Sequence, residues 1–397
     1  MRIGVIGAGH AGIEAAQAAS EAGAEQVVLF SDERELPYYR PRLVMVAFGQ
    51  DQVQKILIHP LEWYTERRIE VRLGRVVAGY DAKRRVVITP TGEQFEFDGL
   101  VVATGAEPVL PAFCAGAPKG VLTLWSEREA ERVSQRVGPG KRIVIVGGGG
   151  IGTEAAVRAA VTGMETILVE KQDRLLAPQF NVAASDSVLR HLDILKVRTL
   201  LGRAAVKAED MPDGDVLIRL DDGQEFKACL ALVAVGSRPR LAEAQSAGLK
   251  IERGICTDRF LHASEPSVFA CGDGVEIEGV VHASAVSASA QGKDAGHNAV
   301  AAIKGLPLRE HVPLPRQFLF KCDRFELVSV GGMAAQGRQE VLLPGCEDLN
   351  YRSVIVENDV VVGLQMVGSR KDFPKYLKLI REKGKLADLA AIAATGG

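Results

Sequence analysis

The segment R2-I-G-V-I-G-A-G-H-A-G-I-E-A-A16 has a second copy, R142-I-V-I-V-G-G-G-G-I-G-T-E-A-A156, which begins 140 residues later. Each copy is a short apolar run, then G-x-G-x-x-G, then an alanine-rich segment. This order predicts a strand, a tight turn and a helix that together bind the pyrophosphate of a dinucleotide. Two such units predict two dinucleotide sites, and a protein with two dinucleotides is expected to move a hydride between them. The matching positions are Gly7 and Gly147, Gly9 and Gly149, Gly12 and Gly152, Glu14 and Glu154, and Gly23 and Gly163.

The three glycines of such a turn have different roles. The first, Gly7, permits a tight bend between strand and helix. The second, Gly9, has no Cβ, so the backbone can approach a pyrophosphate, and the third, Gly12, lets the helix pack closely on the strand. The N–H groups at the start of the helix then face the phosphates, with about half an elementary charge from the helix dipole. The counterparts in the second copy are expected to act in the same way.

Each copy is also expected to carry an acidic residue about 20 residues further on, where a carboxylate accepts hydrogen bonds from ribose hydroxyls. In the first copy the candidate is Asp32, with Glu33 as the alternative one residue later. In the second copy Glu170 ends the apolar run I167-L-V-E. A carboxylate at that place repels a 2′-phosphate, so the second site is predicted to prefer NADH to NADPH, although Lys171 follows directly.

Length and composition narrow the class of protein. A chain of 397 residues is long enough for two or three domains. The formal net charge of −2, with mixed positive and negative residues, and an aromatic content of 5% argue against a nucleic-acid partner. No apolar run reaches the roughly 18–20 residues that span a bilayer. Because the chain opens directly on the strand residues I3-G-V-I, no signal peptide is expected, and the predicted location is the cytoplasm.

The six cysteines are scattered, and none forms a C-x-x-C or C-x-x-x-x-C pair. The sequence therefore predicts neither a metal site nor a local redox disulfide. Free, buried thiols are the expectation in a reducing compartment.

The pattern of apolar runs and breakers predicts an α/β fold with three parts. Two Rossmann-like, three-layer dinucleotide-binding domains are expected at 1–113 together with 246–308, and at 114–245. The run P108-V-L-P-A-F-C-A-G-A-P-K-G120 interrupts all periodicity and is interpreted as the crossing between them. A small α+β domain is expected at 309–397. Ser126, with a glutamate three residues later, predicts the start of a helix.

Five ordered segments resemble the pyridine-nucleotide oxidoreductases, flavoproteins that hold two dinucleotides. The likeness covers nearly the whole chain, and the segment D32-E-R-E-L-P-Y-Y-R-P-R-L43 is similar to the branch of rubredoxin reductases, ferredoxin reductases and the flavin part of nitrite reductase. The five segments are G7-A-G-H-A-G, V101-V-A-T-G-A, G147-G-G-G-I-G, V233-A-V-G-S-R-P and F269-A-C-G-D.

The resemblance implies that the first domain binds FAD and the second binds NADH. It also implies that the helix near 284–292 directs its N-terminus at the flavin, where a helix dipole favours negative charge. The FAD residues that it implies are Gly7, Gly9, Gly12, Asp32, Arg40, Val77, Ala103, Thr104, Gly105 and Asp273. The NADH residues that it implies are Gly147, Gly149, Gly152, Glu170 and Gly236.

The chain departs from the family pattern in two places. Where the disulfide branch has C-x-x-x-x-C, this chain has V44-M-V-A-F48, which argues against thiol–disulfide chemistry. In the ferredoxin-reductase branch a lysine that follows R-P-x-L-S often pairs with the glutamate of the second glycine turn. Met45 stands at the lysine position here, while Glu154 remains. Glu154 either meets another cation near the flavin, with Arg42 as the first candidate, or has only a packing and polarity role.

These observations predict an FAD-dependent NADH:acceptor oxidoreductase that passes electrons to a small redox protein such as rubredoxin or ferredoxin, or to a small molecule. An NADH oxidase that uses oxygen, and a low-turnover flavoprotein that acts as a redox sensor or assembly partner, are the alternatives. The resemblance also implies a possible homodimer through the C-terminal domain.

Overall fold

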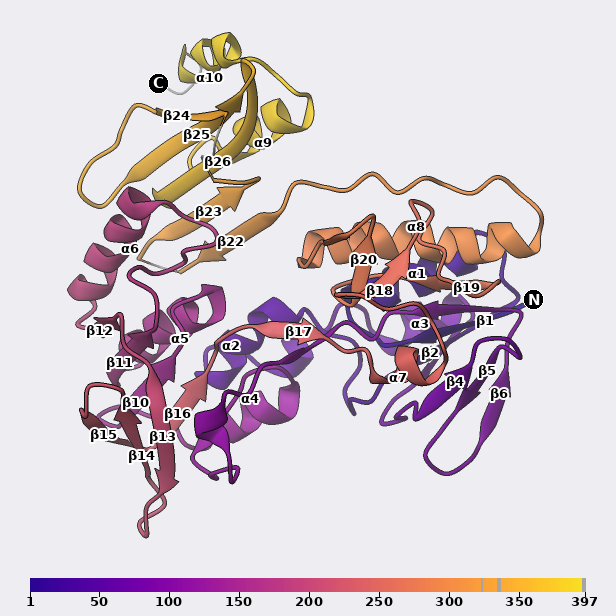
Figure 1. Cartoon of the computed structure of the whole chain (residues 1–397), viewed down its shortest axis with the longest axis horizontal. Coiled ribbons are helices and arrows are strands. Elements are labelled where there is room, and N and C mark those ends of the chain that lie inside the picture. The colour runs from indigo at the N-terminus through magenta and orange to yellow at the C-terminus, as the bar shows by residue number, and fades with distance from the viewer. Residues whose placement is uncertain (323, 334–336, 395–397) are drawn as a thin grey trace.

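The computed structural model describes residues 1–322, 324–333 and 337–394, and it shows three sheet-centred parts (Figure 1). The first and second parts each contain one copy of the glycine turn, and the C-terminal part is connected to the first by a long extended segment. Residues 395–397, which belong to the predicted third domain, lie outside the described residues.

The first part is built on a five-stranded sheet of order β19-β7-β1-β2-β3, in which all neighbours are parallel. Parallel sheets are covered on both faces, and the middle strands are accordingly apolar and buried. The strands are β1 (Arg2–Ile6), β2 (Gln26–Phe30), β3 (Ile69–Arg72), β7 (Gly99–Val102) and β19 (Val268–Ala270).

Two helices from opposite ends of the sequence pack together on this sheet: α1 (His10–Glu21) and α8 (Ala285–Ile303). A Cβ on Gly292 would lie 2.2 Å from the Ala11 carbonyl oxygen, and one on Gly296 would lie 2.1 Å from that of Ala15. The two glycines, one turn apart on α8, therefore allow the helix backbones to touch.

The second part repeats the design with the sheet order β12-β11-β10-β16-β9, again entirely parallel. The helix of the glycine turn is α5 (Gly150–Val161). The two units differ in where their fifth strand lies in the sequence. In the second unit, β9 precedes the glycine turn, whereas in the first unit β19 follows the other four strands. The strands are β9 (Val121–Leu122), β10 (Arg142–Val146), β11 (Glu165–Glu170), β12 (Arg198–Leu201) and β16 (Leu230–Val233).

The chain crosses between the two parts on a pair of antiparallel strands, β8 (Ala106–Pro108) and β17 (Ser237–Pro239). The outward crossing leads into the proline-rich run interpreted above as the crossing. The return precedes residue 246, the predicted start of the second segment of the first domain, since α7 (Ala242–Ser246) already contacts β4 (Gly79–Asp81). The exact division into domains remains a prediction.

Smaller elements complete these two parts. The strands are β5 (Val86–Ile88), β6 (Gln94–Glu96), β13 (Ala205–Asp210), β14 (Val216–Leu220), β15 (Glu225–Ala228), β18 (Ile255–Thr257), β20 (Val275–Ile277) and β21 (Val280–Val281). The helices are α2 (Leu43–Ala47), α3 (Leu61–Glu66), α4 (Glu127–Ser134) and α6 (Val182–Ile194).

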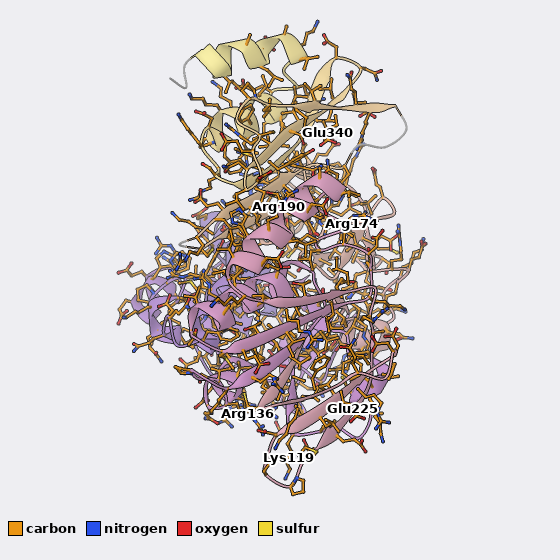
Figure 2. All side chains as sticks on the ribbon, turned by 90° about the vertical axis from the view of Figure 1, so that its left-hand side faces the viewer. Lys119, Arg136, Arg174, Arg190, Glu225 and Glu340 are labelled. Atoms are coloured by element: carbon orange, nitrogen blue, oxygen red, sulfur yellow. The ribbon has the colours of Figure 1, made fainter. Side chains whose placement is uncertain are left out.

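The C-terminal part is an antiparallel sheet of order β22-β23-β26-β25-β24. It packs on the second part, because Phe320, Phe325 and Leu327 share one apolar core with the strands and helices of that part. Figure 2 shows α6, which carries Arg190, between this sheet and the second one. The elements are β22 (Gln317–Lys321), β23 (Glu326–Val330), β24 (Arg338–Leu342), β25 (Tyr351–Glu357), β26 (Val360–Gly368), α9 (Phe373–Arg381) and α10 (Leu389–Ala394).

The predicted fold class is confirmed: two doubly wound parallel units precede a small α+β part. The predicted helix start is also confirmed, since Ser126 and Glu129 form a reciprocal capping box at α4. Among the described residues, no helix combines the length and the apolar character that crossing a bilayer requires.

Candidate functional site

The first glycine of each turn is fixed by its backbone angle and by its neighbours. Gly7 and Gly147 have φ values of +105° and +109°, in the region that disfavours L side chains. A Cβ on Gly7 would lie 2.2 Å from the Ala103 carbonyl oxygen, and one on Gly147 would lie 2.4 Å from that of Ala234. Both turns thus bend sharply against the neighbouring strand, as predicted.

The other two glycines differ from the first and from each other. A Cβ on Gly12 or on Gly152 would lie 1.8 Å from the carbonyl oxygen of the first glycine of the same turn, which confirms their role in close packing. A Cβ on Gly9 or Gly149 would meet nothing within 4 Å. The packing of the protein therefore does not require glycine at these two positions. The physical reason for glycine here is the close approach of a bound group to the backbone.

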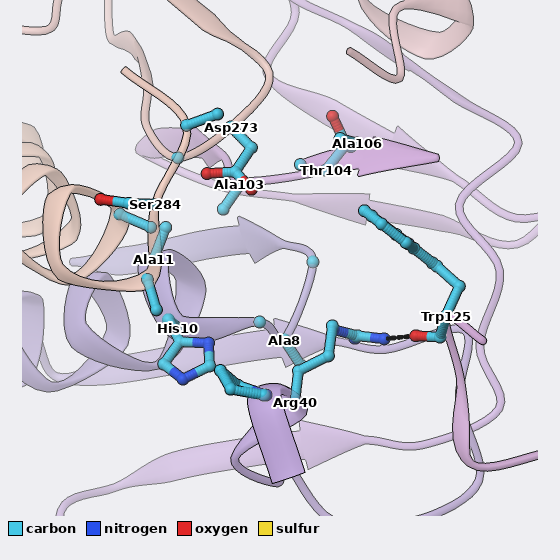
Figure 3. Close-up of a pocket in the computed structure, with 18 of the residues that line it drawn as sticks. Ala8, His10, Ala11, Arg40, Ala103, Thr104, Ala106, Trp125, Asp273 and Ser284 are labelled. Carbon is cyan, nitrogen blue, oxygen red and sulfur yellow. Dashed lines mark hydrogen bonds between the residues drawn. The ribbon is translucent and has the colours of Figure 1, made fainter. Parts of the chain in front are cut away.

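A cavity of about 610 Å³ lies where the three parts meet (Figure 3). Figure 3 shows Ala8, His10 and Ala11 of the first glycine turn on one side and Trp125 reaching in from another. Gly12 lies behind the wall, against Gly7. The structure thus gathers one predicted catalytic residue and nine of the predicted FAD residues: Glu154, and Gly7, Gly9, Asp32, Arg40, Val77, Ala103, Thr104, Gly105 and Asp273.

The two candidate ribose acids of the first unit have different environments. Both oxygens of Glu33 are engaged within the protein, one by the Tyr38 hydroxyl and the other by Arg40 at 2.5 Å. Asp32 is half-exposed at the cavity and accepts from Arg240 at 2.8 Å through one oxygen. Asp32 therefore has the freer carboxylate, and Glu33 has a structural role. Arg40, predicted beside Asp32, is committed to Glu33 and to the backbone carbonyl of Trp125.

Asp273 lines the cavity, and one oxygen of its carboxyl group is unpaired. Its Oδ1 atom is buried without a hydrogen-bond partner among the described residues, and burial raises the pKa of its carboxyl. Ser284 caps α8 through a hydrogen bond from Ser287 N at 3.1 Å, and residues 283–286 line the same cavity. A donor hydroxyl and a group that gains negative charge would both be stabilised here.

The predicted pairing of Glu154 with Arg42 is wrong. Arg42 forms its ion pair with Asp51, whereas Glu154 lies 3.7 Å from Arg158, one turn later on the same helix. Arg42 lies on a short 3-10 turn and is absent from the lining of the cavity. Burial raises the pKa of Glu154 to about 7, and the neighbouring Arg158 opposes that rise.

Arg158 is also a structural contact between all three parts. Its guanidinium donates to Gln50 Oε1 and to the Lys321 carbonyl oxygen, each at 2.9 Å, and its side chain is almost completely buried. The cation beside Glu154 is therefore fixed by the loop after α2 and by β22.

The predicted NADH residues surround the second glycine turn rather than the cavity. Of that turn, only residues 150, 151 and 154 reach the cavity lining. The Glu170 carboxylate accepts from Gly148 N at 2.6 Å and from Gln172 N at 2.7 Å, so it is held against the turn. Gly236 has a φ of +118° and open space at its Cβ position. The roles of Gly147, Gly149, Gly152, Glu170 and Gly236 in binding NADH remain predictions.

The cavity residues that the sequence prediction missed include Trp125, Arg240 and Phe318. Trp125 and Arg240 stand in segments without periodicity, and nothing in the sequence marked them. The sequence does contain one indication of the Phe318 contact. The second turn has a glycine at position 150 that the G-x-G-x-x-G pattern does not require, and Phe318 packs there. A Cβ on Gly150 would lie 2.5 Å from the Phe318 ring.

Comparison with known proteins shows the family of the chain. Residues 1–292 match the family model described as "Pyridine nucleotide-disulphide oxidoreductase". The chain belongs to this family. A probable ferredoxin reductase of Castellaniella defragrans is 32% identical over 274 residues, which are 68% of this chain and 67% of that relative. An assimilatory nitrate reductase electron transfer subunit of Bacillus subtilis is 25% identical over 89% of this chain and 45% of that relative. A p-cumate 2,3-dioxygenase system ferredoxin–NAD(+) reductase component of Pseudomonas putida is 28% identical over 97% of this chain and 94% of that relative.

Solved structures agree on the fold. The putidaredoxin reductase complexed with putidaredoxin superposes with a TM-score of 0.88 at 22% identity and covers 100% of this chain and 98% of that one. The family assignment confirms the predictions of an oxidoreductase, of FAD and NAD(H) as its cofactors, and of electron transfer as its activity.

The residues present fit FAD. The open space at Gly9 leaves room for a pyrophosphate. The unpaired oxygen of Asp273 can accept a hydrogen bond from a hydroxyl group, and Asp32 lines the same cavity. All six cysteines are free thiols, and none of them is among the residues that line the cavity. Val44 lines the cavity at a position where the family's disulfide branch has a cysteine.

Proposed function

We propose that this protein is an NADH-dependent reductase of a small electron-carrier protein of the ferredoxin or rubredoxin type. The observation that carries the proposal is the shared cavity, in which the first glycine turn, Asp273 and the first turn of α5 meet. A cavity lined by both nucleotide units is what transfer between two dinucleotides requires, because the reacting atoms must approach to about 3–3.5 Å. Several relatives are named as ferredoxin or rubredoxin reductases, which supports this class of acceptor.

FAD, when bound, supplies a group that accepts a hydride and releases electrons singly or in pairs. The protein's residues bind and orient it. Asp273 would accept a hydrogen bond from a hydroxyl of the cofactor, and the start of α8 stabilises negative charge with its free N–H groups. Glu154, which also lines the cavity, and its neighbour Arg158 would contribute to the local charge there.

The proposal is tested by anaerobic titration of the flavin-loaded protein with NADH, followed by mixing with a panel of acceptors. We expect the flavin absorbance near 450 nm to bleach with about one equivalent of NADH and to return within seconds on addition of a ferredoxin or rubredoxin. A protein that takes up no FAD, or whose flavin is not reduced by NADH, would overturn the proposal.

The same titration separates the alternatives. An NADH oxidase would reoxidise fastest with oxygen and consume it; the water-forming NADH oxidase of Lactobacillus brevis shares the fold, with a TM-score of 0.86, at 19% identity. A redox sensor would be reduced by NADH yet reoxidise slowly with every acceptor. The homodimer through the C-terminal sheet and the cytoplasmic location stay predictions, and the mass of the protein in solution tests the former.

A further inference from the structure

The backbone of Trp125 is fixed where the first and second parts meet. Its carbonyl oxygen accepts from Arg40 of the first part, as Figure 3 shows, and its N–H donates to Glu129 Oε2 at 2.8 Å. The next residue begins the capping box of α4. A second contact joins the same surfaces, because the Glu127 N–H donates to the Tyr38 hydroxyl at 3.1 Å. The Cα of Trp125 therefore has little freedom.

The side chain of Trp125 extends into the cavity, toward Thr104 and Ala106 (Figure 3). It is half-buried, and within the described part of the chain no aromatic ring or cation packs on the indole. The other tryptophan is different: Trp63 stacks on His59 with ring centroids 3.7 Å apart, and Arg67 lies over its ring. A large aromatic face that lines a cavity without a partner is available to a ligand.

Two chains of contacts connect the surroundings of the indole to Asp32. Arg40, which binds the carbonyl of Trp125, also binds Glu33, the residue after Asp32. Thr104, toward which the ring extends in Figure 3, donates from its hydroxyl to the backbone carbonyl of Arg240 at 3.2 Å, and the guanidinium of Arg240 binds Asp32 at 2.8 Å. Figure 3 shows Asp273 and Ser284 away from Trp125, beyond Ala103.

We propose that the indole of Trp125 is the surface on which the adenine ring of bound FAD stacks. The inference rests on the proposed function, because it requires FAD with its adenosine ribose at Asp32. An adenine joined to that ribose reaches only groups near Asp32, and Trp125 is the unpartnered aromatic ring that the two contact chains bring there. The second nucleotide unit thereby contributes a residue to the FAD site of the first.

The first test uses the full chain freed of flavin and carrying Trp63→Phe, so that Trp125 is the single reporter of tryptophan emission. ADP and FMN serve as probes, because ADP has the adenosine half of FAD and FMN has the flavin half. We expect saturable quenching of Trp125 emission by FAD and by ADP, and little quenching by FMN. Quenching by FMN without quenching by ADP would overturn the inference.

The second test compares the FAD affinity of Trp125→Leu, Trp125→Phe and wild type. Base–aromatic stacking is sequence-tolerant and substantial, so Trp125→Leu should raise the Kd for FAD about tenfold, equivalent to ~1.4 kcal/mol. Trp125→Phe keeps an aromatic face and should stay within about threefold of wild type, and the Kd for FMN should not change in either variant. Trp63→Phe is the matched control, outside the cavity, and should leave the Kd for FAD unchanged.

The outcomes separate this inference from the proposed function. If wild type binds FAD and is reduced by NADH while Trp125→Leu binds FAD with unchanged affinity, only the stacking inference fails. If the flavin-free chain takes up no FAD, both fail.

Discussion

The two nucleotide units share a strand order and differ in where the acid stands. The first strand of each unit pairs with the second in the same register, so Phe30 corresponds to Val169, and Ser31 corresponds to Glu170. Asp32 therefore lies one residue beyond the place that Glu170 occupies. Glu170 is held against its glycine turn by backbone N–H groups, whereas Asp32 is held by the side chain of Arg240. The two glycine turns thus present their acids differently, which is consistent with different dinucleotides.

The walls around the two turns differ as well. The first turn carries His10, which packs edge-on against Tyr39 with centroids 5.2 Å apart, and burial lowers its pKa to about 4, so the ring is neutral at pH 7. The second turn has Gly150 at that position, where Phe318 of β22 packs. The first turn is thus covered within its own part, and the second is covered by the C-terminal sheet.

The largest effect is expected from an alanine at the open glycine of each turn. Gly9→Ala should leave the melting temperature of the flavin-free protein unchanged within a few degrees, since its Cβ meets nothing within 4 Å. It should weaken FAD binding about 10- to 100-fold, because a methyl group holds the phosphates away from N–H donors whose charge-assisted bonds contribute ~1.5–3 kcal/mol each. Gly149→Ala should retain FAD and require correspondingly more NADH for bleaching. Loss of FAD from Gly149→Ala would reverse the assignment of the two units.

The two equivalent glutamates should differ in their effect on stability against pH. The folded protein keeps a proton on Glu154 up to about pH 7, whereas the unfolded chain releases it near 4.5, so the free energy of unfolding should fall as pH rises between these values. The difference amounts to about 3 kcal/mol. Glu154→Gln should remove this slope in urea titrations of the flavin-free protein. Glu14→Gln is the matched control, because Glu14 pairs with the exposed Lys293, and it should keep the wild-type slope.

Cofactor choice is expected to change by about tenfold through the second acid. Glu170→Ala removes the carboxylate that repels a 2′-phosphate, so the ratio of kcat/KM for NADH to that for NADPH should fall about tenfold, ~1.4 kcal/mol. Glu170→Gln keeps an acceptor for Gly148 N but loses the charge, and it should shift the ratio in the same direction. Asp32→Asn should weaken FAD and leave the ratio alone. An unchanged ratio in both Glu170 variants would contradict the ribose assignment.

The smallest effect is expected from Arg42, the residue whose pairing was mispredicted. Its partner is Asp51 and its side chain is half-exposed, so Arg42→Ala should cost no more than ~1 kcal/mol of stability. It should leave the rate of flavin reduction by NADH unchanged in stopped-flow measurements. Arg158→Ala, which removes a buried cation bound to three parts, should lower both stability and rate. A slow Arg42→Ala variant would restore Arg42 to the site.

Local rules explain what the sequence predicted well. The glycine turns, their strands and the α4 capping box depend on residues within one or two turns of each other, so their pattern is visible in the chain. The contact between Glu154 and Arg158 was also predictable from the sequence, because an acidic and a basic residue four positions apart on a helix are neighbours. The comparison with the family pattern instead favoured Arg42 as the partner of Glu154. Trp125 and Phe318 were not predictable as site residues, because their roles depend on how separate parts of the chain pack.

The origin of the fifth strands has a consequence for the order in which the protein is built on the ribosome. The second sheet spans residues from Val121 to Val233 without interruption, so it can close as soon as that stretch has emerged. The first sheet contains β1, which precedes the second sheet in the chain, yet it is complete only when β19 and α8, which ends at Ile303, have been synthesised. Because contiguous units fold during synthesis as they become complete, the part that begins first is finished later. We therefore expect FAD uptake by the first unit to come after the second unit has folded.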